Sequence, residues 1–140
     1  MKRLILAVVA LVPLALLAAD PYIPTDAERA RWTMSDMMSW RTAIDAYCTD
    51  FHHFPEAAAL EQLRDAVQPR YIAHAPMVDG WGHPYRYQRV GDRNYRVVSA
   101  GADGAFDEAT WSIPAKRLPF DADAVVTTEG RWMFRSWEFQ

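Results

Sequence analysis

Residues 25–51 read TDAERARWTMSDMMSWRTAIDAYCTDF and contain neither proline nor glycine. Thr25 and Glu28 have the spacing of a capping box, in which the Thr hydroxyl and the Glu carboxylate satisfy the first free N–H groups of a helix. Apolar residues then recur at three- and four-residue spacing, with one gap at Arg41: Ala30, Met34, Met37, Ile44, Tyr47 and Phe51. The pattern predicts one long amphipathic helix from residue 26 to about residue 49, with its apolar stripe turned to the rest of the fold.

The residues after this helix predict a shorter helix and an antiparallel meander. Residues 56–67 are rich in Ala and Leu and should form the second helix. Residues 79–84 are dense in turn residues, and Trp81, between two glycines, can insert its ring beneath the sheet while the backbone turns tightly around it. Short strands are expected at residues 85–90, 95–100, 125–126 and 131–139. The order indicates an α+β fold, with the long N-terminal helix and the short second helix packed on a small antiparallel sheet.

Residues 1–19 have the layout of an export signal. A basic start precedes an apolar run at residues 4–17, and small residues lie before the polar break at Asp20. The run is shorter than the roughly 20 residues that span a bilayer, which favours a cleaved signal peptide and a periplasmic or secreted protein. Leu17 lies where signal peptidase prefers a small residue, so an uncleaved inner-membrane anchor facing the periplasm is the alternative. Residues 20–140 would then form one globular domain.

Charge and cysteine content narrow the class of partner. The chain has 15 Lys and Arg against 18 Asp and Glu, and without Lys2 and Arg3 the remainder has 13 against 18, a net charge of about −5. An acidic body disfavours nucleic acid or an anionic membrane as the main partner and is compatible with a bound cation. Cys48 is the only cysteine, so no intramolecular disulfide can form. On the predicted helix it is interpreted as a small buried hydrophobe.

Several motifs follow one another along the chain. They are IDAY at residues 44–47, DGWGHPYRY at 79–87, VSAGADG at 98–104 and DADAV at 121–125. In this order they resemble the globular part of the major pseudopilin of type II secretion systems, whose segments read DPWGNPYxY, YSLGADG and an acidic DxDI. The resemblance covers about residues 26–135. It implies a non-catalytic, pilin-like domain that acts by protein–protein contacts in a type II secretion or related cell-envelope system, self-association included.

The loop that follows the second predicted strand is the candidate metal site. Its carboxylates lie toward its two ends, and calcium takes six to eight oxygens from carboxylates and backbone carbonyls. The resemblance implies a calcium ion bound by the side chains of Asp103 and Asp123 and by the Ala100 carbonyl. Asp107 and Asp121 are added to this candidate set from their chemistry alone.

Two segments depart from the family pattern. Residues 105–120 form a longer insertion than the family has, and its Lys116 and Arg117 are an alternative to calcium, because they can neutralise the carboxylates by ion pairing. At the front, the Gly-Phe-Thr-Leu-x-Glu processing motif of pseudopilins is not found, and Pro21 and Pro24 separate the leader from the helix. The resemblance therefore implies the fold more directly than filament assembly.

The sequence contains few patterns that would support catalysis. His52 and His53 follow the long helix with no third soft ligand near them in sequence, which favours a solvated pair over a metal site. No Ser-His-Asp order, glycine-rich phosphate loop or CxxC pair is present. The alternative function is an exported hydrolytic enzyme that would use the loop aspartates and these histidines.

Overall fold

The long helix, α1 (Asp26–Phe51), begins where the capping box predicts, in a computed structural model that describes residues 21–111 and 119–128. Thr25 Oγ1 accepts the Glu28 N–H at 3.3 Å, and Glu28 Oε2 accepts the Thr25 N–H at 2.8 Å. The helix ends at His52, whose φ of 60° is left-handed. Within the described residues, no helix is long and apolar enough to cross a membrane, and the predicted leader lies outside them.

The second helix, α2 (Leu60–Val67), is shorter than predicted, because it starts four residues later. Tertiary contacts hold the preceding segment out of helical conformation. The Phe54 ring packs on Tyr95 with centroids 4.9 Å apart, and the Pro55 carbonyl accepts the Tyr87 hydroxyl at 2.9 Å. Residues 56–59 are good helix formers, but Phe54 and Pro55 before them are held in contact with the core.

Three strands form one antiparallel sheet in the order β1 (Arg86–Val90), β2 (Asn94–Ser99) and β3 (Ala124–Thr127). The observed strands start or end within one residue of the predicted ones. Tyr87 pairs with Val97, and Val97 pairs with Val126. The strand predicted at residues 131–139 lies outside the described residues. The α+β prediction is confirmed.

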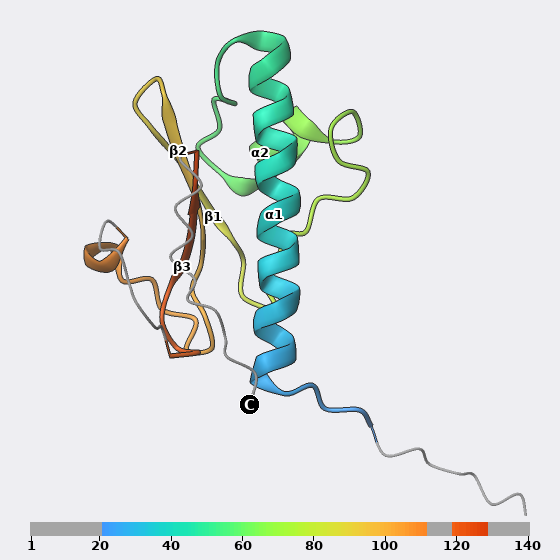
Figure 1. Cartoon of the computed structure of the whole chain (residues 1–140), viewed down its shortest axis with the longest axis vertical. Coiled ribbons are helices and arrows are strands. Elements are labelled where there is room, and N and C mark those ends of the chain that lie inside the picture. The colour runs from blue at the N-terminus through green and yellow to red at the C-terminus, as the bar shows by residue number, and fades with distance from the viewer. Residues whose placement is uncertain (1–20, 112–118, 129–140) are drawn as a thin grey trace, which may run out of the picture.

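The sheet carries a separate apolar cluster on each face. α1 covers one face, where Trp40 and Tyr95 are fully buried and the Trp40 indole donates to the Pro76 carbonyl at 2.8 Å (Figure 1). Alternate residues of β2 point the other way, so Val98 packs with Val125 and Trp111 in a second, smaller cluster. Phe106 and Trp111, from the described part of the loop after β2, therefore cover part of the sheet face opposite the helix.

Trp81 is not beneath the sheet, so that prediction was wrong. Its side chain is half-buried and lies beside the N-terminal end of α1. The indole Nε1 donates to Asp26 Oδ1 at 2.9 Å, and the Phe120 ring is 6.5 Å away. An indole N–H needs an acceptor when it leaves water, and the acidic first turn of α1 supplies one at the rim of the fold.

Candidate functional site

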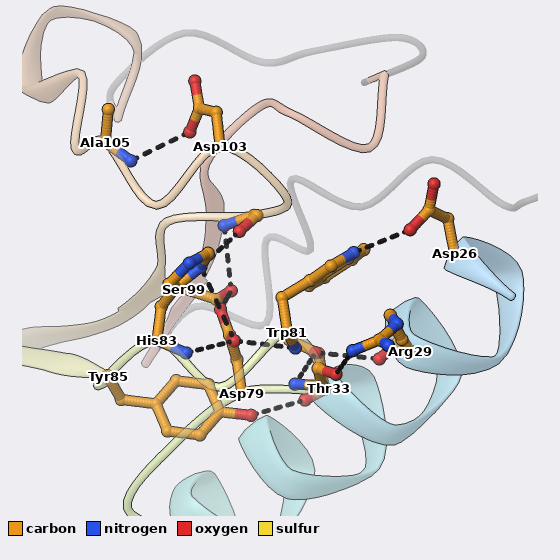
Figure 2. A network of polar contacts seen from close by, with 12 residues as sticks. Asp26, Arg29, Thr33, Asp79, Trp81, His83, Tyr85, Ser99, Asp103 and Ala105 are labelled. Atoms are coloured by element: carbon orange, nitrogen blue, oxygen red, sulfur yellow. Dashed lines mark hydrogen bonds and ion pairs between the residues drawn. The ribbon is translucent and has the colours of Figure 1, made fainter. Parts of the chain in front are cut away.

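The turn at residues 79–84 is built around Asp79, whose side chain is fully buried. Asp79 Oδ1 accepts the backbone N–H groups of Trp81 and His83 at 3.0 and 2.9 Å, and Oδ2 accepts the Ser99 hydroxyl at 2.6 Å (Figure 2). Three donors thus satisfy both oxygens of a carboxylate that has no contact with water. The turn is fixed to the end of β2 through Ser99.

Gly80 brings this turn against the backbone of α1. Its N–H donates to Thr33 Oγ1 at 2.8 Å, and its carbonyl accepts Arg29 Nη1 at 2.9 Å. Thr33 in turn donates to the Arg29 carbonyl at 2.9 Å. A Cβ added at Gly80 would overlap the Arg29 carbonyl group. Only glycine therefore allows this approach.

The same turn reaches the loop that follows β2. His83 Nδ1 lies 2.9 Å from the Gly101 carbonyl oxygen, and the Gly101 N–H donates to Ser99 Oγ at 3.2 Å. Gly104 passes so close to the His83 ring that an added Cβ would lie 2.7 Å from Nε2. Asp79, Ser99 and His83 thus hold the first turn of the loop in place.

The two ends of the loop are joined at Gly101. The φ of Gly101 is 66°, and an added Cβ would lie 2.6 Å from the Ala122 carbonyl oxygen. The Ala102 N–H donates to the Phe120 carbonyl at 2.7 Å. Ser99 and Ala124 form the last pair of the β2–β3 register, and Ala100 and Asp123 are the next residues along the two chain segments.

Asp123 is 5% exposed and is satisfied on one side only. Its Oδ2 accepts the Trp111 indole N–H and the Asp107 backbone N–H, the latter at 2.8 Å. Its Oδ1 is the one buried polar side-chain atom without a hydrogen-bond partner among the described residues. A buried carboxylate oxygen without a donor costs folding free energy unless a cation takes the place of the donor.

The other predicted carboxylates are more exposed. Asp103 Oδ1 accepts the Ala105 N–H at 2.9 Å, and Asp107 Oδ1 accepts the Ala109 N–H at 3.2 Å. Asp121 is exposed next to the buried strand β3. In the described part of the chain, no three His, Cys, Asp or Glu side chains gather as a group able to hold a metal. Any calcium ion here would depend on backbone carbonyls to complete its shell.

The unpartnered oxygen of Asp123 nevertheless fits a calcium ligand. Asp123 precedes Ala124, which pairs with Ser99, and Ser99 is followed by Ala100, a fully buried residue whose carbonyl belongs to the predicted ligand set. Asp103 is on the turn that Gly101 ties to the same end of the sheet. Lys116 and Arg117, the alternative partners of the carboxylates, lie outside the described residues.

His52 and His53 lie at the opposite end of α1 from the loop aspartates. His52 caps its C-terminal end, and His53 Nδ1 is 2.9 Å from the Phe54 carbonyl. The β2–β3 loop lies near the other end of this helix (Figure 1). A helix of 26 residues is about 39 Å long. The structure does not bring the two groups together.

Two contacts of the candidate site had no clear signal in the sequence. Asp79 and Ser99 are 20 residues apart, and Trp111 and Asp123 are 12 residues apart across an insertion with no regular pattern. The one sequence signal for the first contact is the DGWG turn, which requires an acceptor for its exposed N–H groups. The second contact follows only from the tertiary position of Trp111.

Burial changes the acid–base properties of the groups under the turn. Desolvation raises the pKa of the Tyr85 hydroxyl well above its ordinary value, and the nearby Asp36 carboxylate raises it further. Burial also raises the pKa of Asp36, whose Oδ2 accepts the Tyr85 hydroxyl at 3.3 Å. Tyr85 therefore stays protonated and acts as a structural hydrogen-bond donor rather than an acid–base group.

A long helix packed across a small antiparallel sheet, with an irregular loop tied to the sheet end, defines a pilin-like globular domain. The family model for type II secretion system protein G matches residues 24–111. The chain belongs to this family. It is 30% identical over 100 residues to the type II secretion system core protein G of Escherichia coli (strain K12), which covers 60% of this chain and 68% of that protein. No solved structure matches the chain significantly.

The family match ends at Trp111, inside the insertion. The turn at residues 79–84 and the candidate ligand Asp103 therefore fall within the matched region. Asp121 and Asp123 lie beyond it: Asp123 is named from the DADAV motif, and Asp121 from its chemistry alone.

Proposed function

We propose that this protein is a non-catalytic, pseudopilin-like subunit of a type II secretion or related cell-envelope system and works through protein–protein contacts. Membership of the protein G family is the observation that carries the proposal. The domain would face the periplasm, delivered by the leader at residues 1–19, whether that leader is cleaved or retained as an anchor. The separation of His52 and His53 from the loop aspartates gives no support to a hydrolytic enzyme that would use them together.

The outer side of α1 is the surface that best supports such contacts. From residue 32 to residue 42, its exposed positions carry no charge: Trp32, Ser35, Met38, Ser39 and Thr42. The hydroxyls of Ser39 and Thr42 donate to backbone carbonyls one turn earlier, each at 3.0 Å. Their hydrogen bonds are made inside the helix, so a protein partner can cover this side without leaving donors unpaired.

Secretion by a strain that lacks the gene tests this role. We expect the parent gene to restore the release of secreted proteins into the medium, and the Ser39→Arg variant to fail although its melting temperature is unchanged. Ala66→Arg, a small-to-Arg change at an exposed position of α2, is the matched control and should restore secretion. Normal secretion without the gene would contradict the role, and equal rescue by both variants would contradict the use of this helix side.

The second part of the proposal is that a calcium ion stabilises the loop after β2. The unpartnered Asp123 Oδ1 supports it, because a bound cation would remove the cost of that oxygen. Asp103 and the Ala100 carbonyl would complete the protein ligands, with Asp107 and Asp121 as further candidates. Calcium supplies charge neutralisation there and no chemistry.

Thermal melting with and without calcium tests the ion site. A ligand that binds only the folded state raises the melting temperature, so calcium should stabilise the parent domain. Asp103→Ala and Asp123→Ala should each abolish that rise. Because Asp103 is exposed, its replacement should leave the melting temperature in a chelator almost unchanged. A parent protein that shows no shift with calcium would sink the ion site.

A further inference from the structure

Trp111 fixes the orientation of the Asp123 carboxylate. It follows the short helix η1 (Glu108–Thr110) in the insertion and is 4% exposed. Its indole N–H and the Asp107 N–H both donate to Oδ2 of Asp123, whereas Oδ1 has no donor. Both donors come from the inserted loop. One carboxylate oxygen is thus held by the protein, and the other is left for a ligand.

The sheet in turn holds the indole ring. Trp111 packs on Val98 and Val125 and meets the Phe106 ring edge-on, with centroids 6.1 Å apart. The guanidinium groups of Arg86 on β1 and Arg96 on β2 lie 5.7 and 5.6 Å from its ring centroid. These cation–π contacts join the insertion to two neighbouring strands. The donor is therefore placed before any ligand binds.

We propose that Trp111 is a positioning residue for the bound calcium ion: its indole N–H holds Oδ2 so that Oδ1 faces the metal. This inference rests on the proposed calcium site. Outer-shell donors fix the orientation of ligating carboxylates, and their loss weakens metal binding by about 10–100-fold. Trp111 is the last residue that the family model matches and is not itself a candidate ligand, so the calcium affinity would depend on a residue outside the ligand set.

Calcium titration of the Trp111→Phe variant tests the proposal. Phenylalanine keeps an aromatic ring in the cluster and removes the N–H donor. After chelator treatment and at 25 °C, calorimetry should show calcium binding about 10–100-fold weaker than in the parent protein. Trp32→Phe, at an exposed position of α1, is the matched control and should bind calcium like the parent. A merely structural role would lower the melting temperature equally with and without calcium and leave the affinity unchanged.

The indole N–H resonance of Trp111 gives a second readout. In protein labelled with ¹⁵N-tryptophan, this resonance, identified by its loss in Trp111→Phe, should shift during the titration with the calorimetric midpoint. Unchanged affinity in a folded Trp111→Phe variant overturns the inference while the calcium site stands. If that variant does not fold, the five remaining tryptophan variants assign the resonance by exclusion, and its failure to shift overturns the inference. A parent protein that binds no calcium removes the site itself.

Discussion

Asp79 and Asp123 flank the end of β2, and each is 5% exposed, but the protein satisfies them differently. Asp79 accepts three hydrogen bonds shared between both of its oxygens. Asp123 accepts two, both on Oδ2, and its Oδ1 accepts none. Similar burial therefore accompanies two different hydrogen-bonding states. The closed carboxylate joins the turn to the sheet, and the half-open one is available to a cation.

This difference in hydrogen bonding should change how much each carboxylate contributes to the free energy of unfolding. A buried carboxylate whose oxygens all accept hydrogen bonds stabilises the fold, because its removal leaves several donors unpaired. A buried carboxylate with one oxygen that accepts no hydrogen bond destabilises the fold by part of its desolvation free energy until a cation binds. Mutation in a chelator, where no ion can contribute, separates the two cases.

Asp79→Ala should have the largest effect. It leaves the Trp81 and His83 N–H groups and the Ser99 hydroxyl without their acceptor, and each unpaired buried donor costs about 1–3 kcal/mol. We expect a loss of about 3 kcal/mol or more in the free energy of unfolding, the same with and without calcium. Urea unfolding in a chelator and in calcium measures it.

Asp123→Ala is the matched change at the other carboxylate. In a chelator it removes the acceptor of Trp111 and Asp107 but also removes the unpartnered oxygen, so the loss should be smaller, about 1–2 kcal/mol. Losses of equal size at the two positions would contradict the distinction between a closed and a half-open site.

The local parts of this structure could be predicted from the sequence, and the contacts between distant parts could not. Thr25 and Glu28 set the start of α1 by hydrogen bonds within one turn, which is a local property. Phe54 shows the limit, because its contact with Tyr95, 41 positions later, delays α2 beyond the point where composition allows a helix.

The residues of the candidate site fall into the same two groups, those predicted from local sequence and those that depend on distant contacts. Asp103 and Asp123 could be named from motif resemblance, because the loop motifs are contiguous in sequence. The roles of Asp79 and Trp111 depend on partners 20 and 12 residues away and on how the loop folds back over the sheet. Trp81 was misplaced for the same reason. The turn motif predicted the backbone around it, but its ring position depends on Asp26 of α1, which accepts the indole N–H.

Gly80→Ala tests the turn around Asp79 by steric overlap rather than by removal of a charge. A Cβ there overlaps the Arg29 carbonyl, so the turn must move away from α1, which lengthens the hydrogen bonds of Gly80 to Thr33 and Arg29. Overpacking typically costs about 1–3 kcal/mol, so we expect a loss of about 2–3 kcal/mol in the free energy of unfolding. Gly91→Ala is the control, because its φ is 68° but no atom lies within 4 Å of an added Cβ. Only backbone strain of about 1 kcal/mol applies there. A larger loss of unfolding free energy for Gly91→Ala than for Gly80→Ala would show that the turn at residues 79–84 does not need glycine for its approach to α1.

Asp36 offers the smallest test, because its raised pKa indicates that its charged form is disfavoured in the folded protein. Burial raises its pKa above 3.8, and Asp79 adds to the increase, while the Tyr85 hydroxyl opposes it. A carboxyl with a raised pKa in the folded state contributes its full stability below pH 3.8 and loses it as the pH rises through the folded value. Asp36→Asn should therefore match the parent at pH 3 and exceed it at pH 7.

The gain at pH 7 should be small, no more than about 0.5 kcal/mol, because Asp36 is only half-buried and solvent screens its charge. Asparagine keeps an acceptor for the Tyr85 hydroxyl, so the change isolates the charge from the hydrogen bond. Urea unfolding of both proteins from pH 3 to pH 7 measures the difference. A variant less stable than the parent at pH 7 would mean that the Asp36 charge stabilises the fold around the turn at residues 79–84 instead of opposing it.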